Sequence, residues 1–103
     1  MMHMETRESD HAEAENLVKD GKVKKYIFNG VVLWVVVGKE RDYLVLPNIY
    51  CSCEDFYVRV VSRMEKKYCI HLIAQKIAEE DKKYDVYRLD RKELRKIIDY
   101  LLS

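Results

Sequence analysis

The sequence predicts an α+β fold, with a small antiparallel sheet of three to four strands, flanking helices and a Cys3His zinc site. Three observations predict this fold. A stretch of β-branched and aromatic residues contains a hairpin signal, apolar residues at helical spacing stand before and after it, and all three cysteines lie in two short motifs with one histidine. At 103 residues the chain has the size of one domain. We expect residues 1–8 to form a flexible leader and residues 9–103 a single zinc-binding domain.

A short amphipathic helix is predicted near the N-terminus, over residues 11–20. Ala14, Leu17 and Val18 stand three and four positions apart and form a narrow apolar stripe. Gly21 supplies the stop signal. We expect this helix to dock on a sheet.

A three-stranded antiparallel meander is predicted next. Residues 23–28 and 31–37 flank Asn29-Gly30, the strongest two-residue hairpin signal. A third strand, residues 43–46, ends at Pro47 because proline cannot donate to a sheet ladder. The middle strand is apolar on both faces, so helices are expected to cover one face, and a protein partner is a candidate for the other.

The region after the meander is predicted to hold one more strand and a helix. Residues 54–61 alternate as in a strand, which we favour, although their apolar spacing also suits a helix. From Cys69 to about Glu80, apolar residues recur at helical spacing. We expect Cys69 and His71 to lie in the first turn of this helix, where the helix dipole favours a thiolate.

A C-terminal helix with a strong start signal completes the prediction. Asp90 as N-cap and Glu93 three residues later form a capping-box pair. An apolar stripe is expected to pack on the domain and consists of Leu94, Ile97, Ile98 and Leu101. The other face is basic and carries Arg91, Lys92, Arg95 and Lys96.

The candidate metal ligands are Cys51 and Cys53, one residue apart, and Cys69 and His71, again one residue apart. Thiolate sulfur and neutral imidazole nitrogen are donors that Zn²⁺ favours, and four protein ligands leave no open coordination position. The pattern therefore predicts one structural Zn²⁺ as the cofactor. A catalytic or redox thiol and a merely buried cysteine are the alternatives. A Cys51–Cys53 disulfide would close a very tight ring, and an odd cysteine count fits a metal better than a disulfide framework.

The composition argues against several classes of function. The formal net charge is only +1, so attraction to nucleic acid must come from local patches. We recognise no paired carboxylates, glycine-rich phosphate loop or Ser/His/Asp set, and therefore expect no catalysis and no small-molecule substrate. The opening residues 1–4 are followed by polar residues, unlike a signal peptide or membrane span. We expect an intracellular, cytoplasmic protein, nuclear if its source is a eukaryote, without membrane contact.

The motif residues resemble the SWIM zinc finger, whose pattern is C-x-C, a variable spacer and C-x-H. The resemblance covers about a quarter of the chain and rests on Tyr50-Cys51-Ser52-Cys53, Phe56 and Cys69-Ile70-His71-Leu72-Ile73-Ala74. Ala74 resembles the extended motif of the SWIM subunit of the Shu complex, a mediator of homologous recombination with archaeal relatives. The resemblance implies that the two motifs bind zinc and that Ala74 is a tight packing position. It also implies a RecA-like recombinase paralogue as partner.

Two functions follow as expectations. The first is a non-enzymatic zinc module that assists homologous recombination and DNA repair by binding the recombinase paralogue, with the hairpin face around Trp34 as candidate interface. The alternative for Trp34 is a place in the core. The second function is direct binding of single- or double-stranded DNA, with stacking by exposed tyrosines. Its candidate contacts are Lys66, Lys67, Arg91, Lys92, Arg95 and Lys96.

Overall fold

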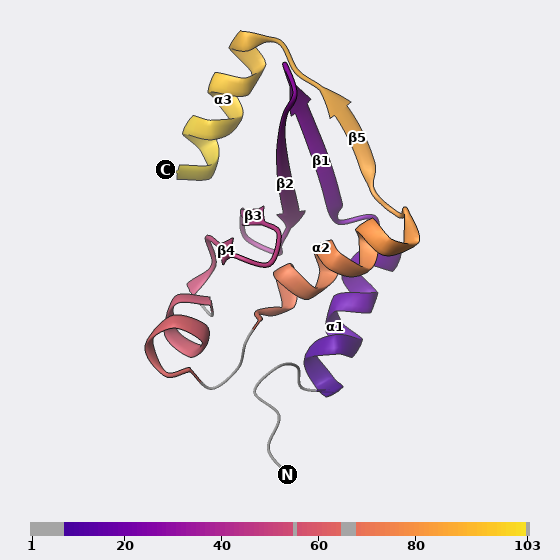
Figure 1. Ribbon diagram of the computed structural model, residues 1–103, viewed down its shortest axis with the longest axis vertical. Helices are drawn as coiled ribbons and strands as arrows, with labels where there is room; N and C mark the ends of the chain where they lie inside the picture. The colour runs from indigo at the N-terminus through magenta and orange to yellow at the C-terminus, as the bar shows by residue number, and fades with distance from the viewer. Residues whose placement is uncertain (1–7, 55, 65–67, 103) are drawn as a thin grey trace.

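The computed structural model describes residues 8–54, 56–64 and 68–102, and these form an α+β fold around one five-stranded sheet (Figure 1). The strand order is β4-β3-β2-β1-β5. The strands are β1 (Val23–Phe28), β2 (Val31–Val37), β3 (Asp42–Leu46), β4 (Tyr50–Cys51) and β5 (Asp85–Arg88). The helices are α1 (Glu8–Lys19), the π-helix η1 (Phe56–Ser62), α2 (Ile70–Asp81) and α3 (Arg91–Leu102).

The β1–β2 hairpin is confirmed at the predicted turn. The two strands pair in antiparallel register from Val23↔Val36 to Phe28↔Val31. Asn29 and Gly30 have φ values of 46° and 81°, and a two-residue turn with both central residues at positive φ matches the twist of the strands that it joins.

The prediction of a purely antiparallel sheet is wrong, because the structure adds β5 as a parallel neighbour of β1. The register runs from Lys24↔Asp85 to Ile27↔Arg88, and the Leu89 N–H extends the pairing with a 2.8 Å hydrogen bond to the Ile27 carbonyl. Strands that pair in parallel need a long crossover connection. Here the connection from β1 to β5 includes α2, so the sheet is mixed.

Helix α2 packs against β1, β2 and β3 on one face of the sheet, and α1 packs against α2 (Figure 1). The predicted stripe of α1 is confirmed, since Ala14 and Val18 are buried in the main core and Leu17 packs against it. The helix begins at Glu8, and residues 1–7 of the predicted leader lie outside the described part of the chain. None of the helices in the described ranges is long and apolar enough to cross a membrane.

The predicted strand over residues 54–61 is wrong, because Phe56–Ser62 is helical. The Tyr57 N–H donates to the Cys53 carbonyl at 3.4 Å, which turns the chain directly after the C-x-C motif. Helical spacing then buries Phe56 and brings Val60 against the core, while Tyr57 and Val61 are exposed. The apolar residues of this segment fit both the strand and the helix periodicity, and burial of Phe56 beside the C-x-C motif selects the helix.

Helix α3 starts at the predicted capping box. The Glu93 N–H donates to Asp90 Oδ1 at 2.8 Å, and the Asp90 N–H donates to Glu93 Oε1 at 3.1 Å. The helix contacts β3 and buries Leu101 outside the main core cluster. Val35 lies outside that cluster and is only 2% exposed, so part of the second face of the sheet, for which the sequence suggested a protein partner, is covered as well.

Trp34 belongs to the main core, so its assignment to an exposed interface is wrong. Its side chain is 3% exposed. The ring of Tyr84 meets it edge to face, with centroids 4.9 Å apart, and Lys25 Nζ lies 5.4 Å from its centroid. Strand β2 is central in the sheet, and its Trp34 side faces the layer of α1 and α2.

Candidate metal centre

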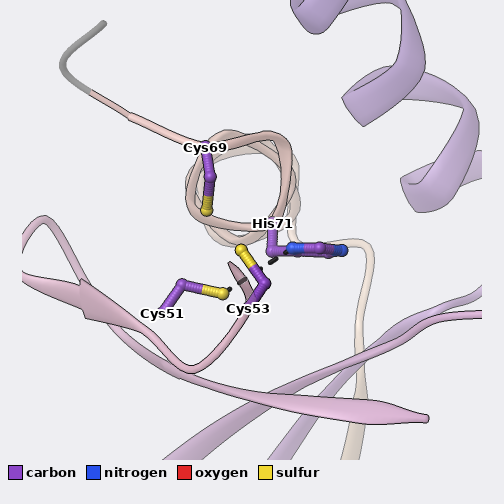
Figure 2. A group of neighbouring side chains, drawn as sticks. All are labelled: Cys51, Cys53, Cys69 and His71. Atoms are coloured by element: carbon purple, nitrogen blue, oxygen red, sulfur yellow. Dashed lines mark hydrogen bonds between the residues drawn. The ribbon is translucent and has the colours of Figure 1, made fainter. Parts of the chain in front are cut away.

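The four predicted ligands come together from two parts of the chain (Figure 2). Cys51 ends β4 and Cys53 follows in the turn, whereas Cys69 is the N-cap of α2 and His71 lies in the first turn of that helix. All four are buried, and their potential ligand atoms lie within 4.8 Å of one another. The cluster could therefore hold one metal ion, with the sheet edge on one side and the start of α2 on the other.

The Cys51–His71 donor pair has the spacing expected around a tetrahedral ion. Cys51 Sγ and His71 Nδ1 are 3.6 Å apart, the separation that Figure 2 marks with a dashed line. Zn–S and Zn–N bonds of about 2.3 and 2.0 Å at a tetrahedral angle place sulfur and nitrogen about 3.5 Å apart. The three cysteines are free thiols in this structure, and all three sulfurs face the same point. A small metal ion with affinity for thiolates matches the spacing of this pair and the donor chemistry of the set.

Backbone hydrogen bonds hold the C-x-C motif in place. The Ser52 N–H donates to the Leu44 carbonyl at 3.0 Å, and the Leu44 N–H donates to Ser52 Oγ at 3.0 Å. This reciprocal pair ties the residue between the two ligands to β3. The Phe56 N–H donates to Cys53 Sγ at 3.2 Å, which supports a thiolate at that position. Ser52 was not among the predicted site residues, although its place between two candidate ligands was a signal.

The second motif uses the start of α2. Cys69 has an extended backbone (φ −83°, ψ 170°) and is the N-cap, one position before the first turn where the sequence placed it. The free backbone N–H groups and the positive end of the helix dipole there favour negative charge on sulfur. Ala74 is fully buried one turn further along, in the core cluster with Leu72 and Ile73.

Crowding of the three thiols pushes their pKa values apart. Hydrogen bonds with Cys51 and Cys69 lower the pKa of Cys53 far below that of an ordinary thiol. Hydrogen bonding to Cys53 and Cys69, together with burial, raises the pKa of Cys51. For Cys69 the contact with Cys51 lowers the pKa, but the hydrogen bond to Cys53 and burial outweigh it and raise the pKa to about 12. A metal that needs three thiolates must displace protons from Cys51 and Cys69, so its affinity falls as pH falls.

The other predicted site residues lie away from this cluster or outside the described chain. Lys66 and Lys67 lie outside the described residues. The four basic residues of the C-terminal helix are exposed on α3, which contributes no ligand, and they are Arg91, Lys92, Arg95 and Lys96. Tyr43 was not predicted as a site residue either, yet its ring centroid lies 4.4 Å from that of His71. No local motif marked Tyr43, because the contact joins β3 to α2.

The chain is similar to an uncharacterized protein of the archaeon Archaeoglobus fulgidus. The two are 37% identical over 73 residues, which is 71% of this chain and 57% of the relative. The chain thus spans little more than half the length of that relative. No family model matches the chain, and no solved structure matches it.

Proposed function

We propose that the chain is a non-enzymatic interaction module, stabilised by one Zn²⁺, that assists homologous recombination by binding a RecA-like recombinase paralogue. The observation that supports it is the buried Cys3His set, formed by the C-x-C and C-x-H motifs that resemble the SWIM zinc finger. Four protein donors fill a tetrahedral coordination shell and leave no position for a substrate or an activated water. A metal bound here would hold the end of β4 to the start of α2 rather than react.

A candidate docking surface lies beside the metal centre. We name it the zinc-side patch: Tyr50, Tyr57 and Val61, which are between 39% and 62% exposed. An open hollow of about 700 Å³ lies next to the C-x-C motif, and Tyr50, Tyr57 and Val61 help to line it. Exposed apolar side chains gathered in one region of a small protein are typical of a protein-binding surface. This patch replaces Trp34 as the proposed interface, and the metal fixes its framework.

Polar substitutions in the zinc-side patch are expected to remove partner binding without unfolding the domain. We expect Tyr57→Ser with Val61→Ser to weaken binding of the recombinase paralogue from the same organism at least about 30-fold, as for interface hot spots. Isothermal titration calorimetry on zinc-loaded protein measures this. Val31→Ser with Val86→Ser is the matched control, because these valines are 54% and 51% exposed elsewhere on the surface. Equal affinity of the patch variant and the wild type would refute the patch as the interface.

A second candidate function, direct binding of single-stranded DNA, is supported by the cations of α3 and a tyrosine pair. Within the described part of the chain, no ion pair involves the basic residues of α3, which are Arg91, Lys92, Arg95 and Lys96. Tyr26 and Tyr87 stack on neighbouring strands with centroids 5.3 Å apart, and Tyr87 is 43% exposed. Single-strand binders combine cations for the phosphates with aromatic rings for the bases.

Charge reversal on α3 tests this second function. We expect Arg91→Glu with Arg95→Glu to lower affinity for a labelled oligothymidylate and to reduce the salt slope by about 0.7 for each phosphate that the variant no longer neutralises. Fluorescence anisotropy at several salt concentrations gives both quantities. Lys76→Glu with Lys83→Glu makes the same charge change at exposed positions on and just after α2. An identical loss of affinity in this control would show general charge attraction, and absence of binding by the wild type would exclude the function.

A further inference from the structure

Tyr43 lies against the one non-sulfur ligand of the metal centre. Its ring and that of His71 have centroids 4.4 Å apart and planes inclined by 32°. Tyr43 is half-buried on β3, and it packs against the main core. Because β3 and α2 are separate elements, this contact couples the orientation of the imidazole to the sheet.

Gly38 allows the turn between β2 and β3 to close onto Tyr43. A Cβ atom at this position would lie 2.6 Å from Cε2 of Tyr43 and 2.7 Å from the Arg41 carbonyl oxygen. The Gly38 N–H also donates to that carbonyl at 2.9 Å, so the backbone cannot retreat without losing a hydrogen bond. Gly38 is not among the glycines with positive φ. The position therefore requires glycine for space, and that space is taken by the Tyr43 ring and the Arg41 carbonyl oxygen.

The imidazole borders an open hollow on the side of this ring. A hollow of about 540 Å³ is lined by His71, Tyr43 and Gly38 together with residues of α1. If the imidazole turned toward this hollow, its Nδ1 atom would face water and would no longer face the three cysteine sulfurs. In the structure Nδ1 instead lies 3.6 Å from Cys51 Sγ, on the metal side. Groups that hold a ligating histidine in its productive rotamer and ring orientation contribute to metal affinity without touching the metal.

We propose that Tyr43 is a positioning residue of the metal centre: its ring, backed by Gly38, holds the His71 imidazole with Nδ1 toward the three sulfurs and thereby tightens metal binding. The proposal rests on the proposed zinc site. It assigns to Tyr43 and Gly38 a role in metal affinity that lies outside the ligand motifs. Loss of the ring should therefore change the coordination geometry as well as the affinity.

Zinc competition and cobalt spectroscopy on purified protein test this role. We expect Tyr43→Ala to bind Zn²⁺ about 10- to 100-fold more weakly than the wild type in competition with a chromophoric chelator. With Co²⁺ in place of Zn²⁺, the d–d bands of this variant should shift. Tyr43→Phe keeps the ring and should stay within about twofold of the wild type in zinc affinity. Gly38→Ala should act in the same direction as Tyr43→Ala, because the added methyl group would press on the ring as well as on the Arg41 carbonyl oxygen.

Tyr26→Ala is the matched control, since Tyr26 is a half-buried tyrosine on β1 that stacks on Tyr87. It should lose stability yet keep the zinc affinity and the cobalt spectrum of the wild type. Equal zinc affinity of Tyr43→Ala and wild type would overturn the proposal, as would an equal loss of affinity in Tyr26→Ala, which would mean that affinity only follows stability. A wild-type chain that binds no zinc would overturn the metal centre itself, so the two failures are distinguishable.

Discussion

Replacing Cys53 with serine, or stripping the metal with a strong chelator, is expected to unfold the domain at temperatures at which the zinc-loaded protein is folded. A structural zinc site contributes on the order of 10 kcal/mol of binding free energy that the unfolded chain lacks. Whole domains are stable by only about 5–15 kcal/mol, so the metal is expected to supply much of the total. Cys53 is the sharpest test, because its thiolate is stabilised by both other thiols and by the Phe56 N–H.

Thermal unfolding followed by circular dichroism, with and without chelator, measures this effect. The chelator should not lower the melting temperature of Cys53→Ser any further, because that variant has already lost the site. Tyr57→Ser introduces the same hydroxyl four residues away at an exposed position and should melt close to the wild type. A wild-type melting curve that the chelator leaves unchanged would contradict a structural metal.

Acidification should also release zinc, since protons compete for Cys51 and Cys69.

Replacing Trp34 with alanine is expected to cost about 3–5 kcal/mol of unfolding free energy, the range for aromatic truncation in a core. The side chain is 3% exposed on the central strand β2. It meets Tyr84 edge to face and lies under the ammonium group of Lys25, so its removal also deletes both of these contacts. In so small a domain, few neighbouring side chains can rearrange to fill a cavity of this size.

Urea unfolding of the zinc-loaded protein gives the free energy. Tyr57→Ala removes an aromatic ring that is 62% exposed and should change stability by less than about 0.5 kcal/mol. A Trp34→Ala variant that stays fully stable but loses the recombinase paralogue would restore the interface that the sequence suggested. Loss of stability with unchanged affinity of the folded fraction is the result that the structure favours.

The sequence by itself determined the features that depend on local chemistry. Asn29-Gly30 specifies its turn because both residues accept positive φ. Asp90 and Glu93 cap α3 because each side chain reaches a backbone N–H of the other residue. The ligand set was likewise predictable, since cysteine and histidine are scarce in the chain and their short spacing can be recognised from the sequence alone.

Only the tertiary structure decided the features that depend on contacts between distant segments. β5 has four residues and no alternating apolar pattern, and it becomes a strand because the chain returns from α2 beside β1. The apolar residues of Phe56–Ser62 fit both the strand and the helix periodicity, and packing of Phe56 beside the C-x-C motif makes this segment helical. Trp34 is core because the layer of helices α1 and α2 packs on its face of the sheet. The apolar sequence of β2 does not show which face of the sheet the helices pack on. The support of His71 by Tyr43 and Gly38 also depends on the tertiary structure, because these three residues come into contact only after folding.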